Sequence, residues 1–226
     1  IKALKVEKTR RDRLQAFRKK LSTLVFLDPA AGSGNFLTET YISLRRLEND
    51  ALFEETHGQM MLGDNDVIQV SIGQFYGIEI NDFAVTVAKT ALWIAESQMM
   101  QETEQLMQIN LDFLPLKSYA NIVEGNALRI DWENVVDKSK LSYIMGNPPF
   151  VGYSLQSKSQ KDDMLSIYVD EKGKPYKTAG KIDYVSAWYF KAAQLMQGTT
   201  VRTAFVSTNS ITQGEQVAGV WKPLYD

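Results

Sequence analysis

The stretch "TLVFLDPAAGSGNFLTETYISL", residues 23–44, constrains the fold more than any other part of the chain. A short apolar run, a glycine turn and a helical pattern follow one another, which predicts a strand, a tight turn and a helix. Gly32 and Gly34 allow positive φ and let the backbone approach a ligand closely. No lysine follows as in a phosphate-binding loop, and Leu37 occupies the third position of Gly-x-Gly-x-x-Gly. Because an Asp-Pro pair precedes the glycines at the strand end, the pattern indicates a ligand-binding turn more specifically than two glycines alone.

The same alternation of strand and helix continues to the end of the chain. Further strands are predicted at 73–80, 119–127, 141–150 and 201–209, with helices from residue 82 and from about residue 185. Asp82 is expected to cap the first of these helices. The alternation predicts an α/β fold with a doubly wound, mostly parallel sheet and right-handed crossovers. Residues 151–180 are polar and are expected to form a long loop near the site.

Composition limits the kinds of site that the chain can carry. Its 226 residues suffice for one sizeable domain, and 44% hydrophobic and 23% charged residues are typical of a soluble globular protein. Disulfides and thiolate metal sites are excluded because the chain has no cysteine, and a single histidine makes a histidine metal cluster or a Ser-His-Asp triad implausible. We expect no metal. With no signal peptide and no transmembrane run, we expect a cytoplasmic protein without membrane contact.

The first 22 residues differ from the rest. Nine basic and two acidic residues within 1–20 give a net charge of +7, which leaves −9 for the remainder. Leu14, Phe17 and Leu21 have helical spacing, so residues 1–22 are expected to form a basic amphipathic helix that leads into a domain at 23–226. The basic face can contact nucleic acid or be solvated. Because the chain lacks an initial Met and a closing element, we expect it to be part of a larger protein.

Two polar residues follow the second and third predicted strands. Glu79 ends the second strand, where an acidic residue hydrogen-bonds ribose hydroxyls in nucleotide-binding doubly wound folds. The alternative is an exposed glutamate or a helix cap. Asn126, beside Gly125, can hydrogen-bond an adenine edge or simply form a turn.

The run "YIMGNPPF", residues 143–150, ends the fourth predicted strand on Asn147-Pro148-Pro149-Phe150. Neither proline can donate to a ladder, but both hold the backbone in an extended path. The Asn147 side-chain oxygen and the Pro148 carbonyl could accept from one amino group and turn its lone pair toward an electrophile, while Phe150 stacks on a flat ring. The alternative is a strand-ending turn. Ligands bind beyond the carboxyl ends of such strands, so Asn147 is expected to face the glycine turn.

The ordered set "DPAAGSGNF", "GIEI", "GNAL" and "GNPPF" resembles the amino-methylating DNA methyltransferases that use S-adenosylmethionine (SAM), in the gamma motif order of N6-adenine enzymes. The runs "GIEINDFAVTVAKTALWIAE" and "GNPPFVGYSLQSKSQKDDM" are similar to MmeI-like type IIG enzymes, in which one chain combines endonuclease and methyltransferase. The resemblance covers residues 24–210. It implies a Rossmann-like class I methyltransferase fold with seven strands, so the catalytic domain is expected to be partial and to lack two strands after residue 210.

The resemblance also implies roles for particular residues. SAM would be held by Asp28, Pro29, Ala30, Gly32, Gly34 and Phe36 at its methionine part, by Glu79 at its ribose, and by Ile80, Asn126 and Ala127 at its adenine. Asn147, Pro148, Pro149 and Phe150 would be catalytic, and Phe150, Tyr153, Asp183 and Tyr184 would line the target pocket. The methyl group would pass in line to N6 of an adenine flipped out of double-stranded DNA. The implied partners on the full-length chain are a target-recognition domain and, in the type IIG case, a nuclease domain.

Other functions stay open at this point. The same Asn-Pro-Pro core serves methylation of cytosine N4, of a base in RNA, or of a glutamine amide in a protein. A non-catalytic SAM-binding module that only positions DNA is a further alternative, which the intact Asn147-Pro148-Pro149-Phe150 motif disfavours. A dehydrogenase is disfavoured by the missing third glycine. No role is assigned to residues 51–72, which include His57, Met60 and Met61.

Overall fold

The computed structural model describes residues 2–56, 67–111 and 120–225; His57, Met60 and Met61 lie outside these ranges. In the described ranges, no helix is long and apolar enough to cross a membrane. The helices and strands, in chain order, are α1 (Lys2–Thr23), β1 (Phe26–Asp28), α2 (Asn35–Thr56), β2 (Phe75–Glu79), α3 (Asp82–Met107), β3 (Asn121–Glu124), β4 (Tyr143–Gly146), α4 (Lys158–Ile167), α5 (Ser186–Met196), β5 (Arg202–Phe205) and α6 (Gly214–Tyr225).

The five strands form one parallel sheet in the order β3-β2-β1-β4-β5. This confirms the predicted α/β class and each predicted strand. Chain order runs outward from β1 in both directions, so the winding reverses between β1 and β4. Such a switch point leaves a crevice beyond the carboxyl ends of the two strands, where open α/β sheets bind ligands. The prediction that strands one and four flank this crevice is confirmed.

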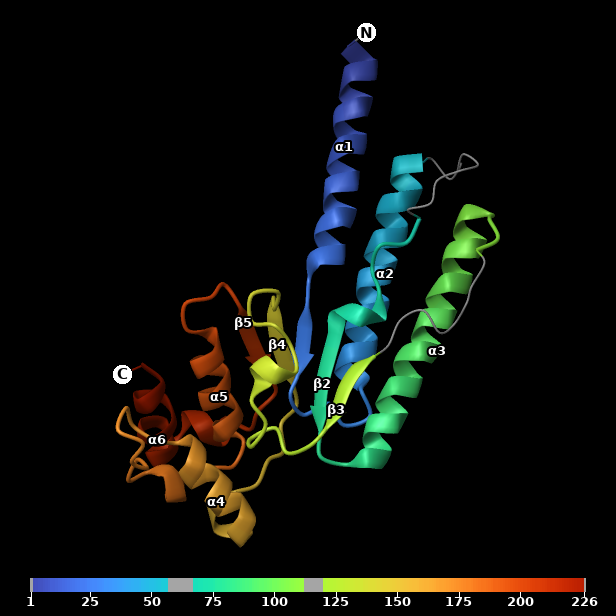
Figure 1. Ribbon diagram of the computed structural model, residues 1–226. Helices are drawn as coiled ribbons and strands as arrows, with labels where there is room; N and C mark the ends of the chain where they lie inside the picture. Colours follow the sequence, from blue (N-terminus) through green and yellow to red (C-terminus); the bar gives the residue numbers. More distant parts are fainter. Residues whose placement is uncertain (1, 57–66, 112–119, 226) are drawn as a thin grey trace.

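Helices cover both faces of the sheet (Figure 1): α2 and α3 lie on one face, and α5 with α4 and α6 on the other. Each face has its own apolar core because successive strand residues point to opposite faces. Phe26 packs toward α2 and α3, where its ring stacks between Phe75 and Tyr143 at centroid distances of 5.2 and 5.3 Å. Leu27, the next residue, belongs to the core under α5. The central strand is therefore buried on both faces.

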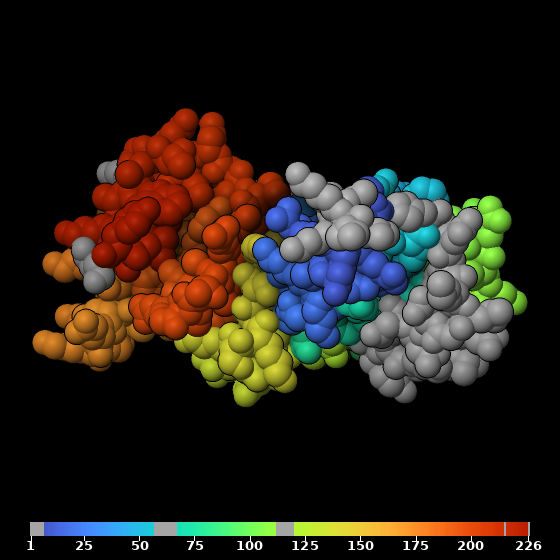
Figure 2. Space-filling view, turned by 90° about the horizontal axis from the view of Figure 1, so that it is seen from above, coloured from blue at the N-terminus to red at the C-terminus, as the bar shows by residue number. Residues whose placement is uncertain are grey.

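Helix α1 confirms the predicted basic helix, although the predicted apolar face is wrong at Phe17. The Phe17 side chain is 40% exposed, whereas Arg18 is buried. Arg18 Nη1 donates to Glu55 of α2 at 2.9 Å, and its Nη2 donates to the Val67 carbonyl at 2.8 Å. Arg18 therefore faces the domain together with Leu21, which is buried as the apolar pattern predicts. Viewed from above, α1 lies between the C-terminal part of the chain on one side and α2 and α3 on the other (Figure 2).

Two other local predictions are wrong. Asn81, rather than Asp82, caps α3: its backbone is extended and its side chain accepts from the Ala84 N–H at 3.0 Å. Residues 151–180 are not one loop, because they contain α4. Ser157 and Gln160 form a reciprocal capping box at the start of α4, and Met164 is fully buried beneath it. The sequence did not predict α4 because its buried residues span only one helical turn among exposed polar residues, which is too short to give a clear helical period.

Candidate active site

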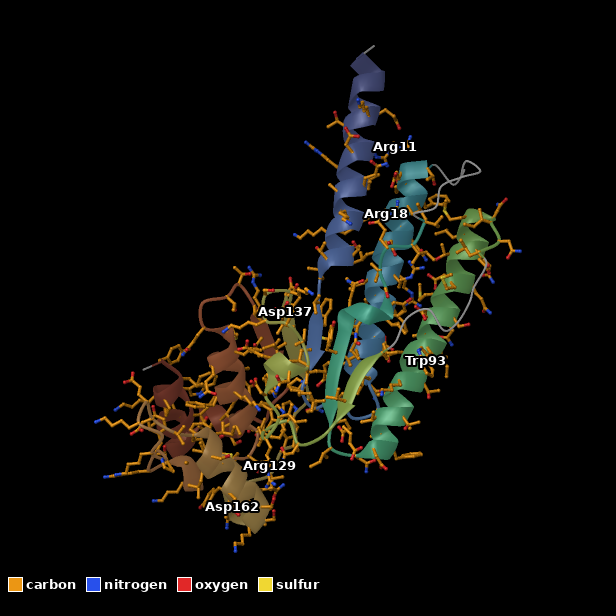
Figure 3. The ribbon with its side chains drawn as sticks, in the orientation of Figure 1. Arg11, Arg18, Trp93, Arg129, Asp137 and Asp162 are labelled. Atoms are coloured by element: carbon orange, nitrogen blue, oxygen red, sulfur yellow. The ribbon has the colours of Figure 1, made fainter. Side chains whose placement is uncertain are left out.

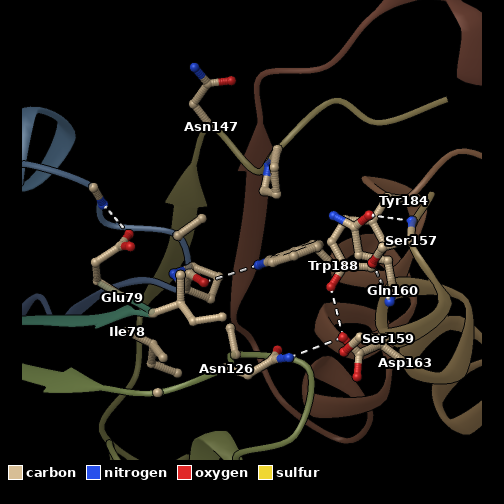
Figure 4. Close-up of a pocket in the computed structure, with 17 residues that line it drawn as sticks. Ile78, Glu79, Asn126, Asn147, Ser157, Ser159, Gln160, Asp163, Tyr184 and Trp188 are labelled. Atoms are coloured by element: carbon tan, nitrogen blue, oxygen red, sulfur yellow. Dashed lines mark hydrogen bonds between the residues drawn. The ribbon is translucent and has the colours of Figure 1, made fainter. Parts of the chain in front are cut away.

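A pocket of about 660 Å³ opens at the carboxyl ends of the strands (Figure 4). Its volume is in the range typical of cofactor and ligand sites. The loops after β1, β2, β3 and β4 all contribute to it, as do α4 and α5. The lining residues are Pro29, Ala30, Gly32, Ile78, Glu79, Ile80, Gly125, Asn126, Ala127, Asn147, Pro149, Ser157, Ser159, Gln160, Asp163, Tyr184 and Trp188.

The carboxylate of Glu79 holds the glycine turn in place. Its Oε2 accepts from the Gly32 N–H at 2.8 Å, and its Oε1 accepts from the Asn81 N–H at 3.0 Å. A carboxylate has about four acceptor positions, so acceptor capacity remains on both oxygens. Glu79 therefore shapes the turn after β1 and can still accept from two further hydroxyl groups in the pocket.

Three residues of the predicted cofactor set, Asp28, Gly34 and Phe36, do not line the pocket. Gly34 has a φ of +82°, and a Cβ built on it would lie 2.9 Å from the Cβ of Ala88 on α3. Its absent side chain thus lets the start of α2 pack against α3. Phe36 lies in the first turn of α2, is 39% exposed and is also outside the lining.

Asp28 lies beneath the pocket, where the end of β1 meets the end of β4. Its Oδ1 accepts from the Ala30 N–H at 2.9 Å, and its side chain is buried. Burial raises the pKa of this carboxyl to about 7; the Ala30 N–H opposes this and the charge of Glu79 adds to it. A Cβ at Gly146 would lie 2.3 Å from Asp28 Oδ1. The two halves of the predicted site are therefore in direct contact.

Asn126 is held at both ends of its amide group. Its Oδ1 accepts from the Leu128 N–H at 2.9 Å, and its Nδ2 donates to Asp163 Oδ2 at 3.0 Å. The adjacent Ala127 carbonyl accepts from Lys191 Nζ of α5 at 2.7 Å. The turn after β3 is thus fixed from α4 and from α5, with Asn126 and Ala127 on the pocket wall.

Residues 147–150 span two anchored points. The Gly146 carbonyl accepts from the Val206 N–H, and the Val151 carbonyl accepts from the Tyr184 N–H, both at 2.9 Å. Asn147 and Pro149 line the pocket, Pro148 is buried, and Phe150 is 45% exposed outside the lining. In Figure 4, Asn147 lies beyond the end of β4, on the far side of the pocket from Asn126 and Asp163, and its amide group points away from Glu79 rather than toward the glycine turn as predicted. The motif thus occupies the opposite wall from the turn after β3.

Besides Phe150, three residues were predicted beside the target base, and they take different positions. Tyr184 lines the pocket, and its hydroxyl donates to Asp163 Oδ2 at 2.9 Å. Asp183 and Tyr153 do not line it: Asp183 Oδ1 accepts from the Tyr153 N–H at 3.2 Å, and its Oδ2 accepts from Ser210 Oγ at 2.7 Å. Asp183 therefore joins the segment after residue 150 to the segment after β5.

Sequence reasoning did not anticipate the part of the wall that α4 and α5 supply. Helix α4 contributes Ser159, Gln160 and Asp163, and its N-cap contributes Ser157. Trp188 of α5 donates from Nε1 to the Pro29 carbonyl at 3.0 Å. The S-x-x-Q capping box at 157–160 is the one sequence signal that could have revealed α4. In the described part of the chain, no group of three His, Cys, Asp or Glu side chains is arranged to hold a metal ion.

Comparisons with known proteins agree with this geometry. The DNA methyltransferase A of Bacillus subtilis (strain 168) is 42% identical over 218 residues, which cover 94% of this chain and 24% of that protein. A putative type II restriction enzyme and methyltransferase of Methanocaldococcus jannaschii is 31% identical over 140 residues, 59% of this chain and 11% of that protein. The chain thus spans about a quarter or less of these relatives.

Solved structures similar to this chain also include restriction-modification enzymes. The type IIL restriction-modification enzyme MmeI, solved in complex with DNA, has a TM-score of 0.89 and 44% identity, over 99% of this chain and 30% of that chain. The type ISP enzyme LlaGI, with a TM-score of 0.52 and 17% identity over 89% of this chain and 17% of that chain, shares the fold alone. The family described as "MmeI, DNA-methyltransferase domain" matches residues 4–226. The chain therefore belongs to the MmeI DNA-methyltransferase domain family.

Proposed function

We propose that this domain transfers the methyl group of SAM to N6 of an adenine flipped out of double-stranded DNA, as the modification activity of a restriction-modification system. The observation that carries the proposal is the single pocket that Asn147 and Pro149 share with Gly32 and Glu79 at the switch point of the sheet. A group able to bind an amine thus shares one pocket with a site able to bind a nucleoside.

The residues present fit the proposed cofactor. Glu79 keeps free acceptor capacity for the two ribose hydroxyls, and Ile80 and Ala127 offer apolar surface to an adenine ring. The buried carboxyl of Asp28 lies next to the turn and favours a cationic ligand when ionised. When bound, SAM supplies an electrophilic methyl group on a sulfonium centre.

The chain's own contribution to the reaction is to orient the amine. Asn147 Oδ1 and the Pro148 carbonyl would accept the two N–H groups of adenine N6, which localises the nitrogen lone pair and directs it into the pocket. Phe150, half-exposed at the outer edge of the motif, offers a face for stacking against the flipped base. Because residues 146 and 151 are both anchored by backbone hydrogen bonds, the backbone between them, which includes the Pro148 carbonyl, is held in position before the base arrives.

The remaining partners follow from the relatives. MmeI, which is 44% identical, is a restriction-modification enzyme whose structure was solved in complex with DNA, which supports DNA as the substrate here. The chain corresponds to a quarter to a third of DNA methyltransferase A and of MmeI. We include in the proposal a target-recognition domain, and a nuclease domain of the type IIG arrangement, on the same full-length chain.

The experiment uses the longest natural chain that contains these residues. The protein is incubated with unmethylated DNA and SAM that carries a deuterated methyl group, and the digested nucleosides are identified by mass spectrometry. The proposal predicts deuterium-labelled N6-methyladenine. Labelled N4-methylcytosine would retain the chemistry and overturn the target base. If the protein binds SAM and labels no base in DNA, the proposal is wrong and RNA, protein glutamine or a non-catalytic role becomes the better explanation.

A further inference from the structure

One buried carboxylate on α4 connects three parts of the candidate active site. We propose that Asp163 is a positioning residue, which fixes the amide of Asn126 in the orientation that recognises an adenine edge. The inference rests on the proposed function, because the adenine in question is that of SAM. It adds to that function the residue that makes the pocket selective for an adenosyl cofactor.

The contacts leave the Asn126 amide one orientation. Asp163 is 3% exposed, and its carboxylate can only accept, so the Asn126 nitrogen must face it. The Leu128 N–H can only donate, so the Asn126 oxygen must face that group. A flipped amide would lose both hydrogen bonds. The side chain is therefore oriented by its partners on both sides.

This orientation leaves a defined pair of groups for a ligand. Asn126 retains one N–H hydrogen and one oxygen lone pair, and it lies on the pocket wall. Adenine presents a ring-nitrogen acceptor beside the donor N6 amino group, and an amide side chain pairs with such an edge through two hydrogen bonds. Hypoxanthine carries an acceptor oxygen in place of that amino group. The fixed amide is thus complementary to adenine and mismatched to hypoxanthine.

Asp163 has the support that a positioning role requires. Its Oδ1 accepts from Arg129 Nε at 2.7 Å, and Arg129 Nη2 donates to Ser159 Oγ at 3.0 Å, so the buried charge has a cationic partner. Its Oδ2 also accepts from the Tyr184 hydroxyl. Arg129 lies at the end of the molecule that carries α4 (Figure 3). An aspartate at 126 would place a second carboxylate beside the first, which explains the asparagine there.

The test measures binding of two cofactor products to the longest natural chain, by titration calorimetry. The probes are S-adenosylhomocysteine and S-inosylhomocysteine, which differ in the base edge. In Asp163→Asn, the new amide can donate as well as accept and no longer fixes Asn126. We expect roughly tenfold weaker binding of the adenosyl probe, the scale of one hydrogen bond to a charged group, and a smaller change for the inosyl probe. The preference for the adenosyl probe should shrink.

Asp162→Asn is the matched control. Asp162 precedes Asp163 on the same helix, is exposed, and loses the same charge on substitution (Figure 3). Both affinities should stay within about twofold of wild type, as for an ordinary surface substitution. Asn126→Asp keeps Asp163 in place and serves if Asp163→Asn does not fold. Asn126→Asp should weaken binding of the adenosyl probe by at least about tenfold, because the carboxylates of residues 126 and 163 then face each other across one hydrogen-bond distance.

The outcomes separate the inference from the proposed function. A wild-type protein that binds neither probe would overturn the proposed function and the inference together. A wild-type protein that prefers the adenosyl probe, with the same preference in Asp163→Asn, would overturn the inference alone. Equal losses for the two probes in Asp163→Asn would also overturn it, because Asp163 would then only hold α4 in place. An unchanged adenosyl affinity in Asn126→Asp would contradict it as well.

Discussion

Gly146 is the point where the two halves of the candidate active site meet, so Gly146→Ala is the most informative single substitution. The new Cβ would lie 2.3 Å from Asp28 Oδ1 and 3.0 Å from Asp28 Cγ. Bonded neighbours aside, real Cβ atoms do not approach other atoms this closely. The Asp28 side chain is buried and holds the Ala30 N–H at 2.9 Å. Either the carboxyl rotates and loses that hydrogen bond, or the end of β4 moves and carries Asn147 with it.

The size of the effect follows from these two responses. Overpacking of one methyl group costs about 1–3 kcal/mol, and loss of the Ala30 hydrogen bond adds about 1 kcal/mol. The free energy of unfolding should fall by at least about 2–4 kcal/mol, because the φ of +154° at Gly146 adds backbone strain for alanine. In a domain of this length, 1 kcal/mol shifts Tm by roughly 2–4 °C, so Tm should fall by roughly 5–15 °C. A shift of about 1 Å at Asn147 should in addition slow methyl transfer about 10²-fold.

Thermal unfolding followed by circular dichroism, together with the initial rate of methyl transfer below Tm, measures both effects. Gly180→Ala is the control for an added methyl group without a clash or a positive φ, since no atom lies within 4 Å of a Cβ at that position. The control should keep the wild-type Tm to about 2 °C, the range of a neutral substitution, and should keep the wild-type rate. A Gly146→Ala protein that behaves like this control would refute the close contact between the ends of β1 and β4.

Three further predictions concern other contacts. Because the folded state raises the pKa of Asp28 from 3.8 to about 7, the contribution of Asp28 to stability should be full below pH 3.8 and be lost as the pH rises through 7. Asp28→Asn should remove this pH dependence from the free energy of unfolding. Identical pH profiles for the variant and the wild type would contradict the raised pKa of Asp28. Arg18→Met leaves the buried Glu55 without its nearest cation, so the free energy of unfolding should fall by about 3 kcal/mol. Because Arg18 does not line the pocket, the affinity for S-adenosylhomocysteine should not change, and a changed affinity in a fully folded protein would contradict this prediction. Trp188→Phe removes the hydrogen bond to the Pro29 carbonyl, so KM for SAM should rise roughly fivefold at unchanged kcat. A lower kcat at unchanged KM would argue against a role of Trp188 in shaping the glycine turn.

Much of the sheet could be predicted because its signals are local. Each strand is a short apolar run followed by a turn residue, and the glycine turn after β1 places the switch point. The edge shared by Gly32, Glu79, Asn126 and Asn147 then follows from the rule that parallel strands end at one side of a sheet. That the four residues line one pocket agrees with this reasoning.

The rest depends on partners far away in the sequence. The Arg18–Glu55 pair joins residues 37 positions apart, so an apolar pattern in α1 could not indicate that Arg18 rather than Phe17 faces the domain. The Asp163–Asn126 contact likewise spans 37 positions, and α4 itself buries only a small part of its surface. Local periodicity carries no information about such pairs, because the energy comes from tertiary contacts.

In the proposed function, the turns after β1, β2 and β3 bind the cofactor, and the end of β4 binds the amine. Asn147→Ala separates the two roles when two quantities are measured on the same protein, the affinity for S-adenosylhomocysteine and the single-turnover rate of methyl transfer to DNA. We expect an affinity within about twofold of wild type and a rate lower by about 10²–10³-fold, the scale for removal of one group that stabilises the transition state. A variant that transfers methyl groups at the wild-type rate would show that Asn147 does not orient the amine.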